Sequence, residues 1–183
     1  MRVAIIPARG GSVRIPRKNI RDFRGKPMMQ WPIQAAQTSS LFDLVIVSTD
    51  DDEVEEIAFD SGAAVRRRPL SDSVKGTHQI AADVLSDFVH TDTVACVIYP
   101  CSPMLSPKDL REAIFWAQAT NRMAASWLPT GDAGCYYVGT PHDFAADREP
   151  YKVVVDPRRF IDINTEDDWQ KAEAMFDALR SNP

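Results

Sequence analysis

The sequence predicts a three-layer α/β/α fold built on a mostly parallel sheet. Short apolar runs alternate with amphipathic segments along the chain, which is typical of strands buried between two layers of helices. Polar or glycine-containing segments follow several of these runs directly, as expected for loops that leave the carboxyl ends of parallel strands. The 183 residues contain no internal repeat or low-complexity linker, so we expect a single domain, residues 1–183.

The first half of the chain supplies three predicted strands and three predicted helices. Apolar runs with polar boundaries predict strands at Val3–Ile6, Leu44–Ser48 and Ala63–Val65. Apolar residues at helical spacing predict helices at Met28–Ser39, from a cap at Thr49 or Asp50 to Ser61, and at Thr77–Phe88.

The second half continues the alternation. Strands are predicted at Val94–Tyr99, Cys135–Val138 and Val153–Val155. Helices are predicted at Pro107–Thr120, where proline suits the first turn, and at Glu166–Leu179 after a cap at Asn164 or Thr165. The residues between Arg122 and Asp132 are expected to form a short connection.

Composition excludes several classes of protein. An apolar content of 44% and a net charge of -5 fit an acidic globular protein and argue against a general nucleic-acid binder. No apolar run is long enough for a signal peptide or a membrane span, so we expect no membrane partner. Three cysteines without metal-binding spacing (Cys96, Cys101 and Cys135) suggest reduced thiols and a cytoplasmic location.

Positive charge is concentrated at the start of the chain. Residues 1–26 contain eight basic side chains and one acidic side chain. The segment after the first strand combines Gly10 and Gly11 with Arg9, Arg14 and Lys18. Exposed amides next to arginine and lysine are the usual means of holding a polyphosphate, so we predict a phosphate-binding loop at residues 7–19. The alternative is a solvated loop whose arginines pair with the acidic body.

Two further segments are candidates for ligand binding. Asp162 and Asn164 are two residues apart, so on an extended segment their side chains point the same way and could bind Mg²⁺ beside phosphates. The alternative is an ordinary helix cap with acids in the first turn. Ser71 and Thr77 flank a polar turn that could contact a base or sugar, and a plain helix cap is the alternative there.

Together these segments resemble the sugar-acid cytidylyltransferases of the CMP-sialic acid synthetase type, above all the pseudaminic acid cytidylyltransferases. The resemblance is strongest at Ile-Pro-Ala-Arg-Gly-Gly-Ser (residues 6–12), followed by Arg-Ile-Pro-Arg-Lys-Asn (14–19). Further matches, in the family's order, are Val47-Ser48-Thr49-Asp50-Asp51, Arg68-Pro69, Gly76-Thr77, Tyr99-Pro100, Asp132-Ala133-Gly134, and Asp162-Ile163 with Asp168-Trp169.

The resemblance implies a Rossmann-like nucleotidyltransferase fold and the transfer of CMP from CTP to a nine-carbon sugar acid, with Mg²⁺ and release of pyrophosphate. It implies catalytic roles for Arg9, Lys18 and Asp162, with metal bound by Asp162 and Asn164. The implied nucleotide-binding residues are Ala8, Arg9, Gly10, Gly11, Ser12, Arg14, Lys18, Asn19, Ser71, Thr77 and Pro100.

The chain departs from the family in the segment at 122–132. The family has a longer segment there, which carries a dimerisation arm and part of the sugar pocket. The shortened segment predicts a monomer or a weak homodimer and a more open sugar site. Val13, where the family usually has lysine, and Asn164, where a second aspartate is common, leave two alternatives open. These are a nucleotide-binding relative with little or no activity, and a nucleotidyltransferase for another sugar.

Overall fold

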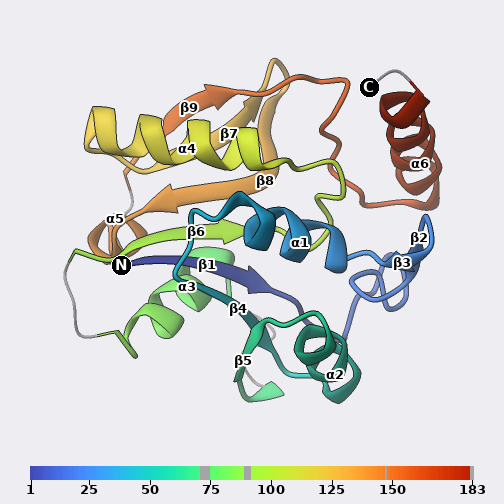
Figure 1. The fold of residues 1–183 in the computed structure, drawn as a ribbon, viewed down its shortest axis with the longest axis horizontal. Coiled ribbons are helices and arrows are strands. Elements are labelled where there is room, and N and C mark those ends of the chain that lie inside the picture. Colours follow the sequence, from blue (N-terminus) through green and yellow to red (C-terminus); the bar gives the residue numbers. More distant parts are fainter. Residues whose placement is uncertain (71–74, 89–91, 147, 182–183) are drawn as a thin grey trace.

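The computed structural model describes residues 1–70, 75–88, 92–146 and 148–181. A seven-stranded sheet runs through its centre (Figure 1). Its strands, in the order in which they lie side by side, are β5 (Ala64–Arg67), β4 (Leu44–Thr49), β1 (Arg2–Pro7), β6 (Val94–Ile98), β8 (Gly131–Gly139), β7 (Ala124–Leu128) and β9 (Tyr151–Val154).

The sheet is mostly parallel, as the sequence predicts. Strand β1 pairs in parallel with both β4 and β6, and β4 pairs in parallel with β5. Strand β8 runs antiparallel to β6 and β7, and β9 is parallel to β7. A separate two-stranded ribbon consists of β2 (Asp22–Phe23) and β3 (Lys26–Pro27).

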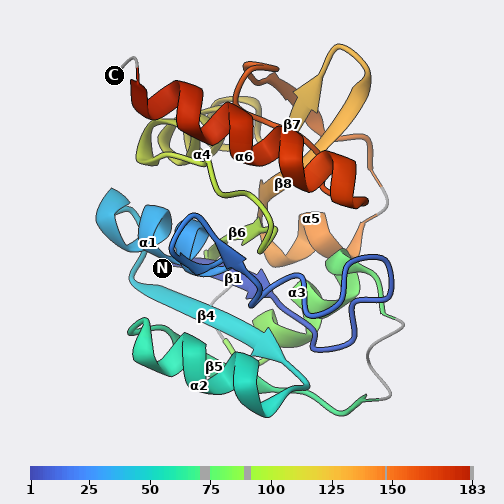
Figure 2. The same cartoon turned by 90° about the vertical axis from the view of Figure 1, so that its right-hand side faces the viewer.

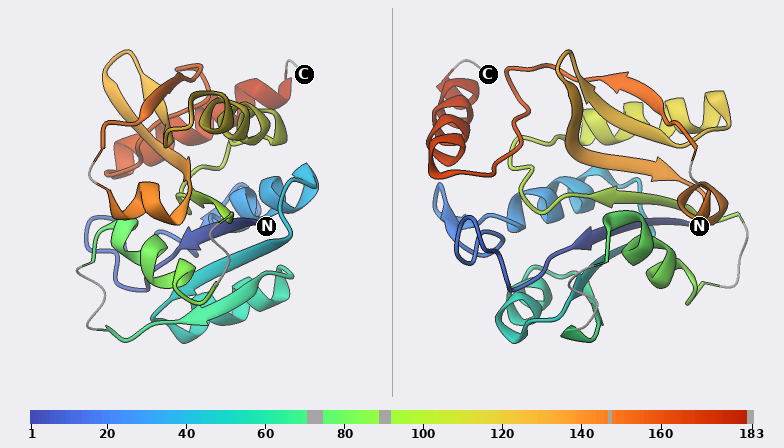
Figure 3. Two further views of the ribbon diagram at one scale, coloured as in Figure 1. Left: turned by 90° about the vertical axis from the view of Figure 1, so that its left-hand side faces the viewer. Right: turned by 180° about the vertical axis from the view of Figure 1, so that it is seen from behind.

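Helices cover both faces of the sheet. Apolar residues of α1 (Gln30–Ser39), α2 (Asp52–Asp60) and α4 (Pro107–Thr120) share a buried cluster with Ala4 and Ile6 of β1. Residues of α3 (Thr77–Leu85) and α5 (Pro141–Ala145) share another with Val3 and Ile5, which point to the opposite face because side chains alternate along a strand (Figure 3). The three-layer α/β/α fold is therefore confirmed.

A third apolar cluster lies beyond the carboxyl ends of β1 and β6. There α6 (Glu166–Ser181) packs through Trp169 and Phe176 against Phe23 of the β2–β3 ribbon, with edge-on aromatic contacts at 5.4 and 5.5 Å between ring centroids. Figure 2 looks onto this end of the sheet, with the loop after β1 and α6 toward the viewer. Within the described residues, no helix has both the length and the apolar character needed to cross a bilayer.

Some boundaries differ from the sequence predictions. The cap of α2 is Asp51 rather than Thr49 or Asp50, because the Asp51 carboxylate accepts a hydrogen bond from the Val54 amide. The expected short connection at 122–132 contains strand β7, which forms a hairpin with β8. The ribbon β2–β3 and the short helix α5 were not predicted, because each is too short to show apolar periodicity.

Candidate functional site

A cavity of about 330 Å³ lies at the carboxyl ends of the central strands, where ligands commonly bind in sheets of this kind. Strand β1 lies between β4 and β6, so the chain leaves its two sides in opposite directions and a crevice forms at the strand carboxyl ends. The walls come from the loop after β1, from the segment leading into α3, from the loop after β6, and from β8 and the segment before α6. The lining residues are Pro7, Arg9, Ser12, Val13, Arg14, Lys18, Asn19, Arg68, Lys75, Gly76, Thr77, Ile80, Tyr99, Pro100, Cys101, Gly134, Ile161 and Asp162.

The described walls of this cavity are strongly basic. Five cationic side chains line it, against the single carboxylate of Asp162; the cations are Arg9, Arg14, Lys18, Arg68 and Lys75. Arg68 is only 6% exposed, so its charge is largely removed from water, where it interacts more strongly with an anion. The cavity is thus suited to a small, multiply charged anion.

The loop after β1 is tied to the neighbouring strand and to itself. The Ala8 amide donates to the Ser48 carbonyl at 2.9 Å, which extends the pairing of β1 with β4 into the loop. At the far end of the loop, the Asn19 side chain donates to the Arg9 carbonyl at 2.9 Å. The loop is therefore closed on itself and places Arg9 and Lys18 in one cavity wall.

The backbone amides of this loop are used differently from the prediction. The Gly10 amide donates to Oδ1 of Asp50 at 3.0 Å, and the Ser12 amide donates to the Gly10 carbonyl at 3.1 Å. The amides of Gly10 and Ser12 thus have partners within the protein. In this structure, the basic side chains rather than an amide nest give the site its charge.

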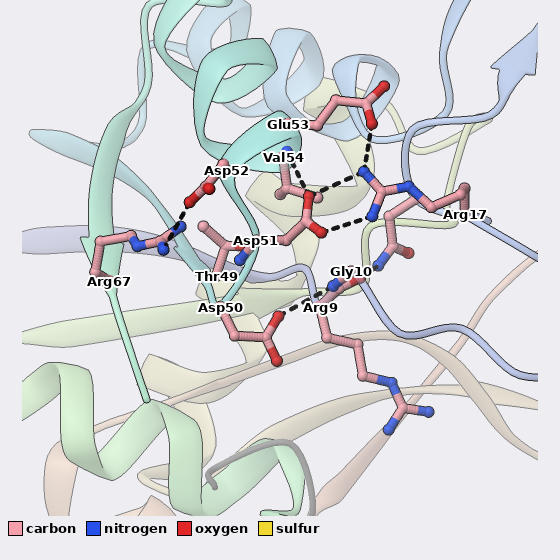
Figure 4. A network of polar contacts seen from close by, with 11 residues as sticks. Arg9, Gly10, Arg17, Thr49, Asp50, Asp51, Asp52, Glu53, Val54 and Arg67 are labelled. Carbon is pink, nitrogen blue, oxygen red and sulfur yellow. Dashed lines mark hydrogen bonds and ion pairs between the residues drawn. The ribbon is translucent and has the colours of Figure 1, made fainter. Parts of the chain in front are cut away.

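Arg17, another cation of this loop, faces away from the cavity. Its guanidinium binds both carboxylate oxygens of Asp51, at 2.6 and 3.0 Å, and also Glu53 (Figure 4). In the same view the Arg9 side chain extends away from this network. The hydrogen bond from Arg17 holds the pKa of Asp51 below its usual value.

The segment before α6 reaches the same cavity through Asp162. Nζ of Lys18 donates to the Ile163 carbonyl at 2.6 Å, next to Asp162 in the chain. The Asn164 side chain donates from Nδ2 to Oδ2 of Asp162 at 2.6 Å, so the two side chains meet as their spacing predicts. The amide nitrogen of Asn164, rather than its oxygen, faces the carboxylate. Among the residues the structure describes, no group of three or more His, Cys, Asp or Glu side chains comes together that could hold a metal ion without help from a ligand.

Hydroxyl groups lie on the side of the cavity that faces β8. Thr77 and Tyr99 share a hydrogen bond of 2.9 Å between their hydroxyl groups, and both line the cavity. Next to them, the Tyr137 hydroxyl donates to the Asp132 carboxylate. Burial raises the pKa of Tyr99, so its hydroxyl keeps its proton and can still donate.

A half-buried thiol completes the wall between the basic loop and Asp162. Sγ of Cys101 lies 3.4 Å from Oδ1 of Asn19, to which it donates. Burial raises the pKa of this thiol to about 11, so it is protonated near neutral pH. Cys101 therefore offers a weak hydrogen-bond donor rather than a nucleophile.

The structure brings most of the predicted site residues together. Those that line the cavity are Arg9, Ser12, Arg14, Lys18, Asn19, Thr77, Pro100 and Asp162. Ala8 is fully buried. Gly10 and Gly11 are next to lining residues in the chain, and Asn164 is two residues from Asp162, but none of the three lines the cavity. Ser71 lies outside the described residues. The helix-cap alternative holds for Thr165, which exchanges hydrogen bonds with Asp168 at the start of α6.

Four lining residues with polar side chains were not among the predicted ones: Arg68, Lys75, Tyr99 and Cys101. A signal for Arg68 and Tyr99 was present, because each precedes a proline in a segment that matches the family resemblance. Lys75 lies within the segment from Ser71 to Thr77 that was a candidate for ligand binding, although nothing singled out the lysine itself. No comparable signal marked Cys101, whose place in the cavity depends on how distant loops meet.

Comparison with known proteins finds relatives that are similar to this chain over about three fifths of its length. It is 42% identical over 117 residues to the pseudaminic acid cytidylyltransferase of Campylobacter jejuni subsp. jejuni serotype O:2, covering 61% of this chain and 50% of that protein. It is 41% identical over 114 residues to the N-acylneuraminate cytidylyltransferase of Oncorhynchus mykiss, covering 61% of this chain and 26% of that protein. The matches to these two relatives thus span half of their length or less.

Solved structures support the fold over nearly the whole chain. A CMP:2-keto-3-deoxy-manno-octonic acid synthetase in complex with CTP superposes with a TM-score of 0.79 at 16% identity, covering 97% of this chain and 99% of that one. A cytidylyltransferase from Leptospira borgpetersenii superposes with a TM-score of 0.73, also at 16% identity, over 100% of this chain and 94% of that one. At this level of identity the likeness shows the fold alone.

The cytidylyltransferase family model matches residues 3–152, from β1 into β9. The matched range includes the loop after β1, the segment leading into α3 and the loop after β6, which together supply all five cations of the cavity. Since the match covers most of the chain and the fold agrees, this chain belongs to the cytidylyltransferase family.

Proposed function

We propose that this chain binds CTP in the basic cavity and transfers CMP to a nonulosonic acid of the pseudaminic or sialic type, with release of pyrophosphate. The observation that carries the proposal is the set of five cations among the described lining residues of one cavity at the carboxyl ends of β1 and β6. A nucleoside triphosphate brings several negative charges to one place, which such a cavity accommodates. The names of the relatives supply the class of nucleotide and of acceptor.

In the proposed reaction, the anomeric hydroxyl oxygen of the sugar acid bonds to the α-phosphorus of CTP. The bond from that phosphorus to the β-phosphate breaks, pyrophosphate leaves, and the hydroxyl proton passes to solvent. No side chain forms a covalent bond, so the work of the protein is to position the reactants and neutralise charge. We assign phosphate binding to Arg9 and Lys18, and binding of the polar acceptor or the ribose to the hydroxyls of Thr77 and Tyr99; this assignment is supported by their position in the cavity lining.

The donor chemistry at Asp162 suits a divalent cation. Mg²⁺ prefers oxygen ligands and commonly uses one or two carboxylates together with substrate phosphates, and Asp162 provides a carboxylate in the wall of a basic cavity. When bound there, Mg²⁺ would neutralise phosphate charge and align the triphosphate. Asn164 holds the carboxylate through its hydrogen bond, and we propose it as a helper to this site.

The test is a pyrophosphate-release assay with CTP, Mg²⁺ and pseudaminic, sialic, legionaminic or 3-deoxy-manno-octulosonic acid. We expect release with CTP and at least one nine-carbon acid, little with ATP, GTP or UTP, and loss of activity in Arg9→Ala. Calorimetry of CTP binding runs in parallel. Tight CTP binding without pyrophosphate release in the presence of any of the acids would favour a non-catalytic nucleotide-binding protein. Pyrophosphate release only with another nucleotide or another sugar would indicate a nucleotidyltransferase of different specificity.

A further inference from the structure

Asp51 is fixed by hydrogen bonds at the junction between strand β4 and helix α2. Its carboxylate accepts the Val54 amide at 3.0 Å as the N-cap of α2, and its own amide donates to the Thr49 hydroxyl at 3.2 Å at the end of β4. Its position is therefore set by the strand and the helix on either side of it. A carboxylate fixed in this way can serve as an anchor for another part of the chain.

The basic loop meets this anchor at two points. Near the start of the loop, Gly10 lies so close to Asp51 that an added Cβ would sit 2.1 Å from its Oδ2 atom. Near the end of the loop, Arg17 grips both oxygens of the same carboxylate, at 2.6 and 3.0 Å (Figure 4). One side chain from outside the loop thus contacts both of its ends.

The two loop residues that meet Asp51 are the chain neighbours of the two cations proposed to bind phosphate. Gly10 follows Arg9, and Arg17 precedes Lys18. Arg17 also has a φ of 55°, in the left-handed region that non-glycine residues rarely adopt, so surrounding contacts must hold it there. The amides of Ile20 and Arg21 both donate to its carbonyl at 2.9 Å, which makes Arg17 the corner from which Lys18 is directed.

Arg17 itself is poorly placed to bind an anion. Its guanidinium already pairs with Asp51 and Glu53, and it does not line the cavity. Two carboxylates beside it neutralise the charge that a phosphate would need. Its sequence context, in a run of cations, suggests a phosphate ligand, and its contacts indicate a different role.

From these contacts we infer that the Asp51–Arg17 pair is a positioning device that sets the separation of Arg9 and Lys18 for the triphosphate of the substrate. The inference rests on the proposed function, because it assumes that these two cations bind the nucleotide. Asp51 and Arg17 act on the ligand through their neighbours and touch neither phosphate nor metal.

The test compares CTP binding by calorimetry in Arg17→Ala, Asp51→Asn, the double variant and Arg67→Ala. Arg67→Ala is the matched control, because Arg67 also pairs with two carboxylates of α2, Asp52 at 2.8 Å and Glu55 at 3.1 Å. Among the described residues, neither of these two carboxylates pairs with the basic loop. We expect each single variant to weaken CTP binding roughly tenfold, the double variant to be no weaker than either, and the control to match the wild type.

A second readout separates positioning from a general loss of stability. Ethylguanidinium in the buffer should restore CTP affinity to Arg17→Ala, since it can refill the place of the guanidinium beside Asp51, and should not restore it to Asp51→Asn. If Arg17→Ala does not fold, Asp51→Asn carries the binding test alone, because asparagine has nearly the same shape and still caps α2.

Two results would overturn the inference. Wild-type CTP affinity in Arg17→Ala and Asp51→Asn would show that the pair positions nothing. Losses that add in the double variant and that ethylguanidinium does not restore would show that Arg17 binds phosphate directly. A wild-type protein that does not bind CTP at all would instead refute the proposed function.

Discussion

Nζ of Lys18 donates a hydrogen bond of 2.6 Å to the carbonyl oxygen of Ile163, 145 residues further along the chain. The contact joins the loop after β1 to the segment that carries Asp162, so the cation and the carboxylate reach one cavity. An ammonium group has three hydrogens, and one bond to a carbonyl leaves two for another acceptor. Lys18 can therefore fix the cavity wall and bind a phosphate at the same time.

Replacing Lys18 by alanine should weaken CTP binding by roughly one to two powers of ten, because a hydrogen bond to a charged group contributes about 1.5–3 kcal/mol. Isothermal titration calorimetry in the presence of Mg²⁺ measures the change. Lys171→Ala, an exposed lysine on α6, is the control and should bind CTP as the wild type does. CTP affinity that is equal in the two variants would contradict a phosphate-binding role for Lys18.

Asp162→Asn should abolish metal-dependent turnover, whereas Asn164→Asp should preserve or raise it. The first change removes the carboxylate that the described walls of the cavity contain, and the second adds negative charge beside it. Titration of activity against Mg²⁺ separates the two variants, since an effect on the metal changes the concentration needed for half-maximal rate. A normal Mg²⁺ dependence in Asp162→Asn would place the metal elsewhere.

The sheet and its main helices could be predicted because buried strands and amphipathic helices leave regular apolar patterns. Strand β7 was missed for a physical reason. Its residues, Ala124–Leu128, include small and polar side chains and lie within the predicted connection, and their pairing with β8 depends on a partner that the local pattern does not reveal. The ribbon β2–β3 has only two residues in each strand and carries no periodic signal.

Site residues could be predicted where side chains of suitable chemistry directly follow a predicted strand. Arg9 and Lys18 follow directly from glycines and cations after a strand. The use of Gly10 was not predictable, because its amide binds Asp50 and its missing side chain makes room for Asp51, both 40 or more residues away. The split between Lys18, which faces the cavity, and Arg17, which faces Asp51, likewise depends on tertiary contacts.

Gly10→Ala should destabilise the protein, and Gly11→Ala should not. A Cβ at Gly10 would lie 2.1 Å from Oδ2 of Asp51 and would force that side chain away from Arg17, whereas a Cβ at Gly11 meets nothing within 4 Å. Crowding of this kind typically costs about 1–3 kcal/mol of the free energy of unfolding. Thermal unfolding measured by circular dichroism compares the two variants. A melting temperature that is the same in both would show that Asp51 moves aside without cost.

The thiol of Cys101 should react slowly with a disulfide reagent at pH 8, and about tenfold faster for each unit of rising pH. Burial raises its pKa to about 11, so only about one molecule in a thousand carries the reactive thiolate at pH 8. With an aromatic disulfide as the reagent, each reacting thiol releases one coloured thiophenolate, whose absorbance gives the rate. Bound CTP should slow the reaction further, because Cys101 lines the cavity. Cys101→Ser supplies the blank. Rapid labelling at neutral pH would contradict the burial of the Cys101 thiol, and no protection by CTP would contradict its position in the CTP-binding cavity.

We expect a monomer, or a dimer that dissociates on dilution. The connection between β7 and β8 is only the pair Pro129 and Thr130, which cannot supply an arm that crosses to another subunit. A stable interface buries about 1,200 Å² or more in total, so without an arm it would need another large complementary surface. Light scattering from micromolar to nanomolar concentration measures the mass.

The same shortening should leave the acceptor side of the cavity open, so the affinity for the sugar acid should be lower than that for CTP. A dimer that persists at nanomolar concentration, or a sugar acid that binds as tightly as CTP, would contradict this prediction.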